Sequence, residues 1–522
     1  MLVLGIHKDP WHNTGAALIK RNEKGEVDFA FISEERLDRK KDSRNFPLKS
    51  INAVLKLLNV VKEDLDLIVM DYIINPNWKL DNKSGEENID DFFIGIDEEK
   101  IVTIEHHLAH AYSTFYSSTF NESAILVVDG RGSQKKTQSL YKASLEDGIE
   151  FIQSTDKASI GLLYASVTQL IGFNLMQEGK TMGLAPYGKN KRIFDFNISF
   201  DGIETDYSEL MHDGKYTFKK NYEYEDIADA AYEIQEECEK VMLHLASYAK
   251  EKVGTKNLCL SGGVALNSVS NYKILKEKIY NNIFINPACS DTGIPLGCAL
   301  YGFHKILKQD KTYSEISPYL GCSYSDKSIK VILDNFNGFQ IYEDINLEKT
   351  VKLLVDNKIV ACHQGRSEMG PRALGNRSIL MSPLVAENKN ILNSRVKHRE
   401  MFRPFAPACL EEYAEEYYDI DRPSPYMLFV PKVKKTKEKL LKAVTHIDGT
   451  GRLQTLTKER NPHFYSIVNK FYKKTGVPVL LNTSFNVANE PVVETPEDAI
   501  KCFLANSIDG LLIGKYLLIK DF

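Results

Sequence analysis

Leu2-Val-Leu-Gly-Ile-His7 is followed, after a turn, by Gly15-Ala-Ala-Leu-Ile19, and the same order recurs in Ala124-Ile-Leu-Val-Val-Asp-Gly130 and Gln138-Ser-Leu-Tyr-Lys142. Each pair joins an apolar run, a polar or glycine-rich turn and a second short run, which is the pattern of a β-hairpin. The recurrence of one such unit indicates two similar halves. Paired hairpins of this kind suit phosphate or nucleotide binding, so the sequence predicts a duplicated α/β domain at the start of the chain.

A pair of histidines precedes the second apolar run, in Glu105-His-His-Leu-Ala-His-Ala111. On a helix His106 and His110 share a face because they are four residues apart, and Asp129 at the end of the next strand can supply a third ligand to one metal ion. His107 and His110 are an alternative pair, three residues apart. Packed histidines without a metal are the competing interpretation. A metalloprotease is not expected, because the residue after the first histidine is His107 and not Glu.

Composition limits the class of protein. The 522 residues suffice for about two to four domains, and the net charge of -5 with a pI near 6.2 gives no overall attraction to nucleic acid or to an anionic membrane. No apolar run approaches the roughly 18 residues of a membrane span, and the eight cysteines form no Cys-x-x-Cys pair. We therefore expect a cytoplasmic protein without a membrane or nucleic-acid partner.

Glycines at a turn mark a further candidate site, in Asn257-Leu-Cys-Leu-Ser-Gly-Gly-Val-Ala-Leu-Asn267. Glycines between a strand and a helix let backbone amides approach an anionic or nucleotide ligand, although a tight turn requires glycine in any case. Tyr224 to Val253 has helical periodicity and is interpreted as scaffold. The charged, turn-rich passage from Lys308 to Pro318 is the best candidate for a linker.

After this linker the conspicuous segments become rich in arginine. Guanidinium, ammonium and hydroxyl donors beside Gly or Pro turns are typical of sites that bind phosphate and carboxylate oxygens. Solvated surface charge and DNA binding are the alternatives, but the balanced net charge favours a compact pocket for small phosphorylated ligands. The segments are Gly365-Arg-Ser-Glu-Met-Gly-Pro-Arg-Ala-Leu-Gly-Asn-Arg-Ser378, Arg395-Val-Lys-His-Arg-Glu-Met-Phe-Arg-Pro-Phe-Ala-Pro407, Val444-Thr-His-Ile-Asp-Gly-Thr-Gly-Arg-Leu-Gln-Thr455 and Leu480-Leu-Asn-Thr-Ser-Phe-Asn486.

Together these segments resemble the O-carbamoyltransferases of the NodU/CmcH family, which includes tobramycin carbamoyltransferase. The resemblance extends over nearly the whole chain. Its other segments are Ser33-Glu-Glu-Arg-Leu-Asp-Arg-Lys40, Val128-Asp-Gly130, Glu178-Gly-Lys-Thr-Met-Gly-Leu-Ala-Pro-Tyr-Gly188 and Glu490-Pro-Val-Val493.

The resemblance implies two domains and two reaction steps. Residues 1–312 would form the actin-like, sugar-kinase-like (ribonuclease-H-like) duplicated domain, and residues 313–522 a YrdC-like α+β domain. The second domain would make carbamoyl-adenylate from carbamoyl phosphate and ATP, with Mg²⁺ accompanying the ATP. The first would transfer the carbamoyl group to a hydroxyl of a small-molecule or glycan acceptor and release AMP.

The resemblance also implies roles for individual residues. His12 matches the catalytic histidine of the family, which takes a proton from the acceptor hydroxyl. The divalent metal site, of the iron type, falls on His106, His110, Asp129 and Asp291. Binding of carbamoyl phosphate and ATP falls on Arg372, Lys397, Arg403, Arg452, Asn482 and Ser484. Candidates for holding the adenylate in the first domain are Lys180, Gly262, Gly263 and Asn267.

Two positions depart from the family. Ser133 and Asn13 stand where the family usually has acidic residues, which leaves the acceptor preference open. Other functions also stay open, namely carbamoylation of a nucleoside or tRNA, as in threonylcarbamoyl-adenosine synthesis, or a non-catalytic nucleotide-binding regulatory role. A hydrogenase-maturation carbamoyltransferase is not expected without Cys-x-x-Cys pairs. A sugar kinase alone would leave the last 200 residues or so without a function.

Overall fold

The structure is a computed structural model that describes residues 1–8, 12–77, 92–157, 159–189, 191–194, 196, 199–207, 211–212, 215–216 and 224–521. The chain divides into two compact units, which are described separately. Unit 1 comprises Met1–Glu34 and Asp42–Ile316, and unit 2 comprises Glu35–Lys41 and Ser317–Phe522.

Unit 1 contains the same five-stranded sheet twice. In each sheet one strand pairs antiparallel with the central strand and a second pairs antiparallel with that strand. On the other side of the central strand a third strand pairs parallel with it, and a fourth pairs parallel with the third. Both hairpins predicted from the sequence are confirmed. The first sheet has the order β3 (Val27–Ser33), β2 (Gly15–Arg21), β1 (Leu2–His7), β4 (Leu67–Tyr72) and β5 (Ile101–Glu105), and the second has the order β8 (Gly148–Thr155), β7 (Gln138–Ser144), β6 (Glu122–Val128), β13 (Asn257–Ser261) and β14 (Asn282–Ile285).

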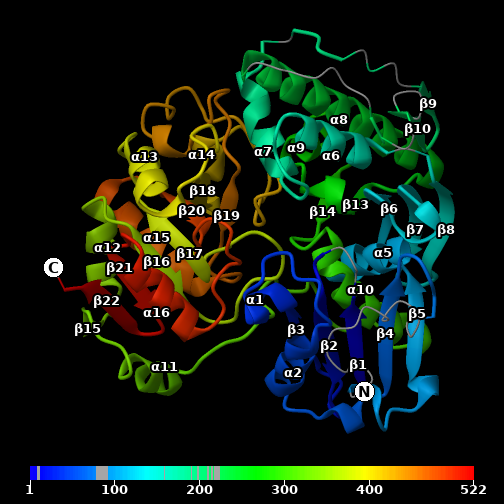
Figure 1. Cartoon of the computed structure of the whole chain (residues 1–522), viewed down its shortest axis with the longest axis horizontal. Helices are drawn as coiled ribbons and strands as arrows, with labels where there is room; N and C mark the ends of the chain where they lie inside the picture. Colours follow the sequence, from blue (N-terminus) through cyan, green and yellow to red (C-terminus); the bar gives the residue numbers. More distant parts are fainter. Residues whose placement is uncertain are drawn as a thin grey trace. The chain divides into compact units, whose positions relative to one another are not determined.

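Two helices pack together between these sheets: α5 (His106–Ser117) contacts β6 and β13, and α10 (Ile294–Tyr301) contacts β1, β2 and β4 (Figure 1). Their backbones approach closely, because a Cβ atom on Gly297 would lie 2.0 Å from the carbonyl oxygen of Ala109. A larger residue at position 297 would force the helices apart. The glycine thereby fixes the start of α10 beside α5, where the histidine pair lies.

The other helices of unit 1 cover the sheets from outside. Helix α8 contacts α6, α7, α9 and β6, which confirms the predicted long helix over Tyr224–Val253. Helix α2 covers β2 and β3. The bounds are α2 (Leu48–Leu57), α6 (Ile160–Leu170), α7 (Glu178–Leu184), α8 (Tyr224–Val253) and α9 (Ser268–Lys276), and two short hairpins are formed by β9 (Ser199–Asp201) with β10 (Glu204–Asp206) and by β11 (Met211–His212) with β12 (Lys215–Tyr216).

Unit 2 is built on one mixed sheet of eight strands. Only β16–β21 and β18–β19 are parallel among its described strand pairs. The order is β15 (Phe339–Glu343), β22 (Tyr516–Lys520), β21 (Gly510–Ile513), β16 (Val360–His363), β17 (Arg377–Met381), β20 (Val479–Ser484), β18 (Ala406–Leu410) and β19 (Gln454–Leu456). The helices are α11 (Asp326–Leu333), α12 (Glu348–Val355), α13 (Asn388–Leu392), α14 (Ala414–Tyr417), α15 (Pro462–Thr475) and α16 (Pro496–Ala505).

The core of unit 2 lies between the sheet and helices α12 and α15. Leu354 and Phe471 from these helices pack with Leu480 and Leu512 from the strands, and all four are fully buried. Because apolar burial contributes about 25 cal/mol per Å², this layer supplies a large part of the stability of unit 2.

A short segment near the N-terminus belongs to unit 2. It includes most of α1 (Glu34–Asp38) and overlaps the predicted family segment Ser33–Lys40. Arg39 donates hydrogen bonds to the carbonyl oxygens of Val492 at 2.7 Å and Pro491 at 3.0 Å. The chain therefore leaves unit 1 after Glu34 and returns at Asp42.

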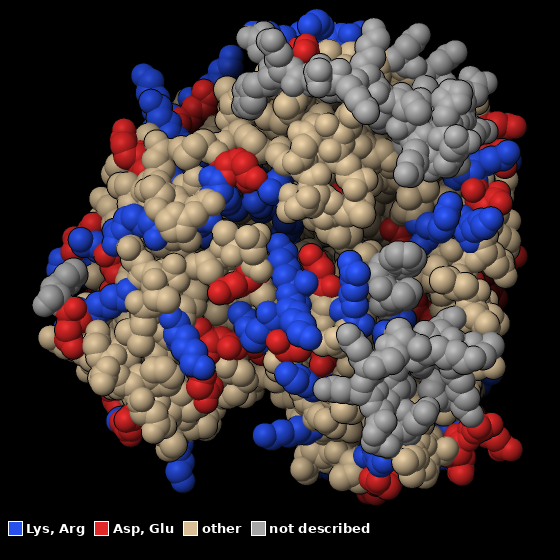
Figure 2. Space-filling view, in the orientation of Figure 1, with Lys and Arg blue, Asp and Glu red and all other residues tan. Residues whose placement is uncertain are grey.

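None of the helices in the described part of the chain is both long enough and apolar enough to cross a lipid bilayer. Basic and acidic side chains both occur across the described part of the face drawn in Figure 2, in keeping with the small net charge of -5.

Candidate metal centre and cationic cluster

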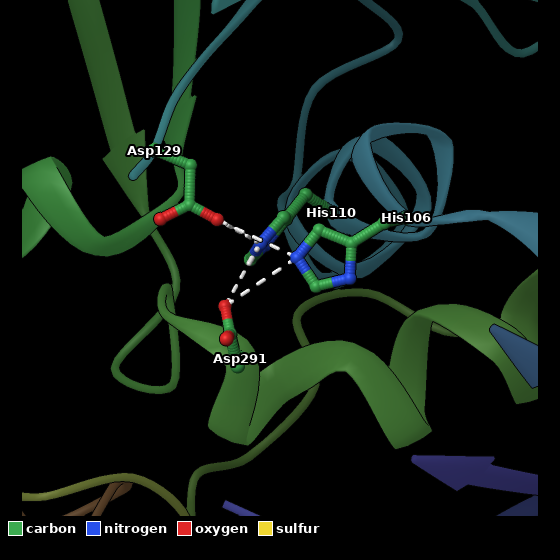
Figure 3. A group of neighbouring side chains, drawn as sticks. All are labelled: His106, His110, Asp129 and Asp291. Carbon is green, nitrogen blue, oxygen red and sulfur yellow. Dashed lines mark ion pairs between the residues drawn. The ribbon is translucent and has the colours of Figure 1, made fainter. Parts of the chain in front are cut away.

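Four buried side chains of unit 1 converge on one point (Figure 3). His106 and His110 lie one turn apart on α5, Asp129 follows the end of β6, and Asp291 begins the turn that leads into α10. Oδ2 of Asp129 lies 3.4 Å from Nε2 of both histidines. Oδ1 of Asp291 lies 3.5 Å from Nε2 of His106 and 3.4 Å from that of His110.

This arrangement fits a divalent metal ion. Two ligand atoms bound to one tetrahedral ion at about 2.1 Å are separated by about 3.4 Å, and the four measured nitrogen-to-oxygen distances are 3.4 to 3.5 Å. Nε2 of His106 and of His110 is buried and has no hydrogen-bond partner among the described residues. A buried nitrogen is costly without a partner, and a bound cation would provide one.

The charges of this group compensate one another. Burial lowers the pKa of His106 and of His110, but the carboxylates of Asp129 and Asp291 outweigh it and raise both values above 6.5. Burial likewise raises the pKa of each aspartate, but the histidines lower both below the usual 3.8. The carboxylates therefore favour the protonated form of each histidine when no metal is bound, and a cation must compete with those protons.

The glycine turn after β13 positions one of the ligands. Oδ1 of Asp129 accepts hydrogen bonds from the backbone N–H of Gly130 at 2.8 Å and of Gly263 at 3.0 Å, which leaves Oδ2 for the histidines. Gly262 has a φ of 88°, and its N–H donates to the carbonyl of Cys289 at 2.8 Å. Both amides are thus bonded within the protein. The predicted adenylate contact of Gly262 and Gly263 stays a prediction.

The ambiguity between the three histidines is resolved, because His107 is not part of the group. Its Nδ1 lies 2.7 Å from Oγ of Ser139, on the neighbouring strand β7. Ser133, which departs from the family pattern, is buried and accepts a hydrogen bond from the backbone N–H of His106 at 3.0 Å. Its hydroxyl also donates to the carbonyl of Tyr72. Ser133 thus holds the start of α5 against the end of β4.

The predicted catalytic histidine lies next to the metal group. Nδ1 of His12 is 3.7 Å from Oδ2 of Asp291, and the side chain of His12 is 24% exposed. The amide nitrogen of Asn13 lies 2.9 Å from the same Nδ1. Asp291 therefore faces the histidine pair with one oxygen and His12 with the other.

Lys180 and Asn267 lie on elements outside the metal group. The ammonium of Lys180 lies 5.3 Å from the centre of the Phe173 ring. Asn267 caps α9 and exchanges two side-chain hydrogen bonds with Gln235, at 2.9 and 3.2 Å. These contacts tie Asn267 to the scaffold, and a role for either residue in adenylate binding stays a prediction.

Unit 2 carries the cationic cluster, which we define as Arg372, Lys397, Arg399, Arg403 and Arg452. Burial, followed by the charges of Arg372, Arg399 and Arg403, lowers the pKa of Arg452 well below its usual 12.5. Burial and Arg403 lower the pKa of Arg399 to about 9, and burial and Arg399 also lower that of Lys397. The carboxylate of Glu400 lies 3.6 Å from the guanidinium of Arg403. Such a concentration of like charge fits a polyanionic ligand.

Two more predicted residues, Asn482 and Ser484, lie on strand β20 beside this cluster. The ammonium of Lys397 donates to the carbonyl of Ser484 at 3.0 Å and to Oδ1 of Asn486 at 2.7 Å. Asn482, on the same strand β20, donates to Gln454 at 2.8 Å. Its Oδ1 is buried without a partner among the described residues, so it can accept one further hydrogen bond.

Two supporting residues were missed in the sequence. Arg399 lies inside the quoted segment Arg395–Pro407 and was not singled out, although its spacing from Arg403 matches a helical turn. Asp71 is the last residue but one of β4, and its Oδ2 lies 2.8 Å from Nδ1 of His106. The signal for Asp71 was an acid at the end of an apolar run, the same signal that identified Asp129.

Comparison with known proteins gives consistent family matches. Residues 83–300 match the model for the carbamoyltransferase N-terminus, and residues 351–520 match that for the carbamoyltransferase C-terminus. Nodulation protein NolNO of Sinorhizobium fredii is 35% identical, over 97% of this chain and 79% of its own length. Nodulation protein NolO of Bradyrhizobium diazoefficiens is 34% identical, over 80% of this chain and 79% of its own length.

Among solved structures, HypF in its phosphate- and nucleotide-bound form aligns with a TM-score of 0.40 and 15% identity, over 59% of this chain and 56% of HypF. The two family models together cover most of both units, and NolNO matches almost the full length of the chain. The chain belongs to the carbamoyltransferase family.

Proposed function

We propose that the protein makes carbamoyl-adenylate in unit 2 and transfers the carbamoyl group in unit 1 to a hydroxyl of a small-molecule or glycan acceptor. In this proposal unit 1 is the actin-like domain and unit 2 is the YrdC-like domain. Carbamoyl phosphate, ATP and water give carbamoyl-adenylate, phosphate and pyrophosphate. The acceptor hydroxyl then replaces AMP on the carbamoyl carbon.

The cationic cluster supports the first step. Carbamoyl phosphate and ATP bring many negative charges together, and fixed guanidinium groups offset their repulsion. Arg372, Arg403 and Arg452 would bind phosphate oxygens, and Lys397 and Ser484 lie within hydrogen-bond reach of each other beside them. Mg²⁺ would enter with the ATP. Asn482 would use its buried Oδ1 to orient the carbamoyl amide.

The group around His106 supports the second step. A divalent ion, for which we propose Fe²⁺, held by His106, His110, Asp129 and Asp291 would act as a Lewis acid on the adenylate. His12 would accept the proton of the acceptor hydroxyl as the new carbon–oxygen bond forms and the bond to AMP breaks. The second oxygen of Asp291, 3.7 Å from Nδ1 of His12, would stabilise the imidazolium that forms when His12 accepts this proton.

One observation carries the proposal. A chain of the carbamoyltransferase family holds a buried His/Asp group suited to a cation in one unit and a cluster of cations suited to a polyanion in the other. Two sites of opposite character match a reaction with an activation step and a transfer step.

The test is pyrophosphate release from ATP with and without carbamoyl phosphate, in the absence of any acceptor. We expect release only when both substrates are present, because carbamate from carbamoyl phosphate is the group that is adenylated. Equal release without carbamoyl phosphate would refute the adenylation step. An acceptor screen that detects the mass gain of a carbamoyl group would then identify the hydroxyl.

A further inference from the structure

We propose that Asp71, supported by His7, is a positioning residue that fixes the tautomer and the ring orientation of His106, so that Nε2 of His106 is ready to bind a metal ion. This inference rests on the metal site within the proposed function. It concerns the hydrogen bonds behind the site that join His7, Asp71 and His106.

The relay originates in the register of the first sheet. Strands β1 and β4 are parallel, with Ile6 opposite Met70, and the next residues along them are His7 and Asp71. Parallel strands end at the same edge of a sheet, so these two side chains meet there. Nδ1 of His7 lies 2.7 Å from Oδ1 of Asp71, and Nδ1 of His106 lies 2.8 Å from Oδ2. All three side chains are buried.

The proton positions follow from the acceptor. Each oxygen of Asp71 lies at hydrogen-bond distance from one imidazole Nδ1, 2.7 Å from that of His7 and 2.8 Å from that of His106, which is the environment of an ionised carboxylate. A carboxylate can only accept hydrogen bonds, so Nδ1 of each ring must be the donor. Neutral His106 then carries its proton on Nδ1 and its lone pair on Nε2. Nε2 is the atom that faces Asp129 and Asp291.

The second histidine ligand has a weaker support, which provides an internal comparison. Oγ of Ser261 donates to the carbonyl of Cys289 at 3.1 Å, so it accepts from Nδ1 of His110 at 3.2 Å. Both ligands thus present Nε2 to the same centre. The acceptor behind His110 is a neutral hydroxyl at a longer distance, whereas that behind His106 is a carboxylate, whose charge-assisted hydrogen bond is stronger.

A second metal ion between His7, Asp71 and His106 is the alternative, because these side chains also group closely. The distances favour hydrogen bonds. Two ligands at about 2.1 Å from one ion are about 3.0 Å apart even at a right angle, whereas the nitrogen-to-oxygen distances here are 2.7 and 2.8 Å. At Asp129 and Asp291 the nitrogen-to-oxygen distances are 3.4 to 3.5 Å, which is long enough for both atoms to bind one ion.

The test is a titration of the full chain with Co²⁺, followed by visible absorption, which reports the metal centre without catalysis. Asp71→Ala removes the acceptor, and we expect about 10- to 100-fold weaker Co²⁺ binding. Asp71→Asn keeps one acceptor oxygen without its charge, so we expect partial rescue, to a loss of about fivefold. Ser261→Ala removes the weaker support and should cost less affinity than Asp71→Ala. Circular dichroism checks that each variant is folded.

The outcomes separate the inference from the proposed function. Wild-type binding of one Co²⁺ per chain together with Asp71→Ala affinity within about twofold of wild type would overturn the positioning role and leave the metal site intact. Two Co²⁺ per chain, one of them lost in His7→Gln, would overturn it in favour of a second ion. If Asp71→Ala does not fold, a Co²⁺ affinity of Asp71→Asn equal to that of the wild type would overturn the positioning role. Absence of Co²⁺ binding by the wild type would overturn the metal site and the inference with it.

Discussion

The metal group of unit 1 and the cationic cluster of unit 2 are both buried sites of high charge. In the metal group opposite charges lie together, whereas in the cationic cluster like charges lie together. In unit 1 each histidine faces two carboxylates, and the pKa values of all four groups move toward their charged forms. In unit 2 guanidinium groups face one another, and burial with the like charges lowers the pKa of Arg452 and Arg399 toward their neutral forms.

The difference indicates what each site lacks. The metal group is neutralised by its own protons, so a cation must compete with protons to enter. The cationic cluster brings like charges together, so an anion relieves repulsion as it enters. The first site should therefore respond to pH and metal, and the second to phosphates. Each of the following experiments alters one site and leaves the other as its control.

The largest expected effect is loss of transfer in His110→Ala. The substitution removes one of two nitrogen ligands, which leaves two carboxylates and one imidazole for the ion. We expect carbamoyl transfer to fall below detection, while pyrophosphate release driven by carbamoyl phosphate continues. Co²⁺ binding should be lost in parallel with transfer.

The matched control for this variant is His244→Ala. His244 lies on α8, and its Nε2 is within 2.7 Å of the carbonyl of Gly202, away from the metal group. It should retain both half-reactions. Loss of both half-reactions in a folded His110→Ala protein would contradict separate sites.

Arg452→Met should have the next largest effect, on the other site. The methionine keeps much of the side-chain volume but removes the charge that Arg372, Arg399 and Arg403 surround. We expect adenylation to fall about 10²- to 10³-fold, as for other electrostatic contacts to a transition state. Co²⁺ affinity should equal that of the wild type.

Arg395→Met is the control for Arg452→Met. Arg395 lies in the same arginine-rich segment but pairs with Asp509 at 3.1 Å and not with the cluster. Its adenylation rate should stay close to that of the wild type. A comparable loss in both variants would show that overall positive charge matters and that the cluster has no special role.

Local patterns in the sequence indicated much of the fold and of the site. Two apolar runs with turns gave the repeated hairpins, because alternation and turn residues act over a few positions. Spacing on a helix, and an acid at the end of a strand, brought His106, His110 and Asp129 together. Asp291 was predicted as a ligand only from the family resemblance, because no spacing rule links the residues before α10 to those of α5.

The remaining features depend on contacts between distant segments. The pairing of His7 with Asp71 requires that β1 and β4 be adjacent and in register, which neither strand shows alone. Arg39 joins unit 2 through bonds to Pro491 and Val492, more than 450 positions later in the chain. A glycine in a turn gives no information about which acceptor its N–H reaches, and the N–H of Gly263 reaches Oδ1 of Asp129.

The pH dependence of metal binding should show a smaller but graded effect. The pKa values of His106 and His110 are raised above 6.5 in the metal-free protein, so Co²⁺ has to displace protons. Affinity should increase by about tenfold per pH unit for each proton displaced, until the pH exceeds the raised pKa values. Chelator competition across this range measures it, and an affinity independent of pH would contradict proton displacement.

Stability of the metal-free protein should change with pH in the opposite direction. A histidine whose pKa is raised on folding contributes stability below its unfolded value, here 6.5, and that contribution is lost as the pH rises through the raised value. Thermal unfolding with a chelator present should therefore show a falling Tm over the range in which Co²⁺ binds more tightly. A Tm that rises there would contradict the charged histidine pair.

The smallest expected effect is stabilisation by pyrophosphate. A ligand that binds only the folded state at about 100 times its Kd adds about 2.7 kcal/mol, which corresponds to roughly 5 to 10 °C in the Tm of a unit of this size. The shift should shrink in Arg452→Met and persist in Arg395→Met and His110→Ala. It should also weaken at high salt, because mobile ions already screen the repulsion that pyrophosphate relieves. An equal shift in Arg452→Met and wild type would mean that the anion binds elsewhere, and the contrast between the two sites would then rest on the metal group alone.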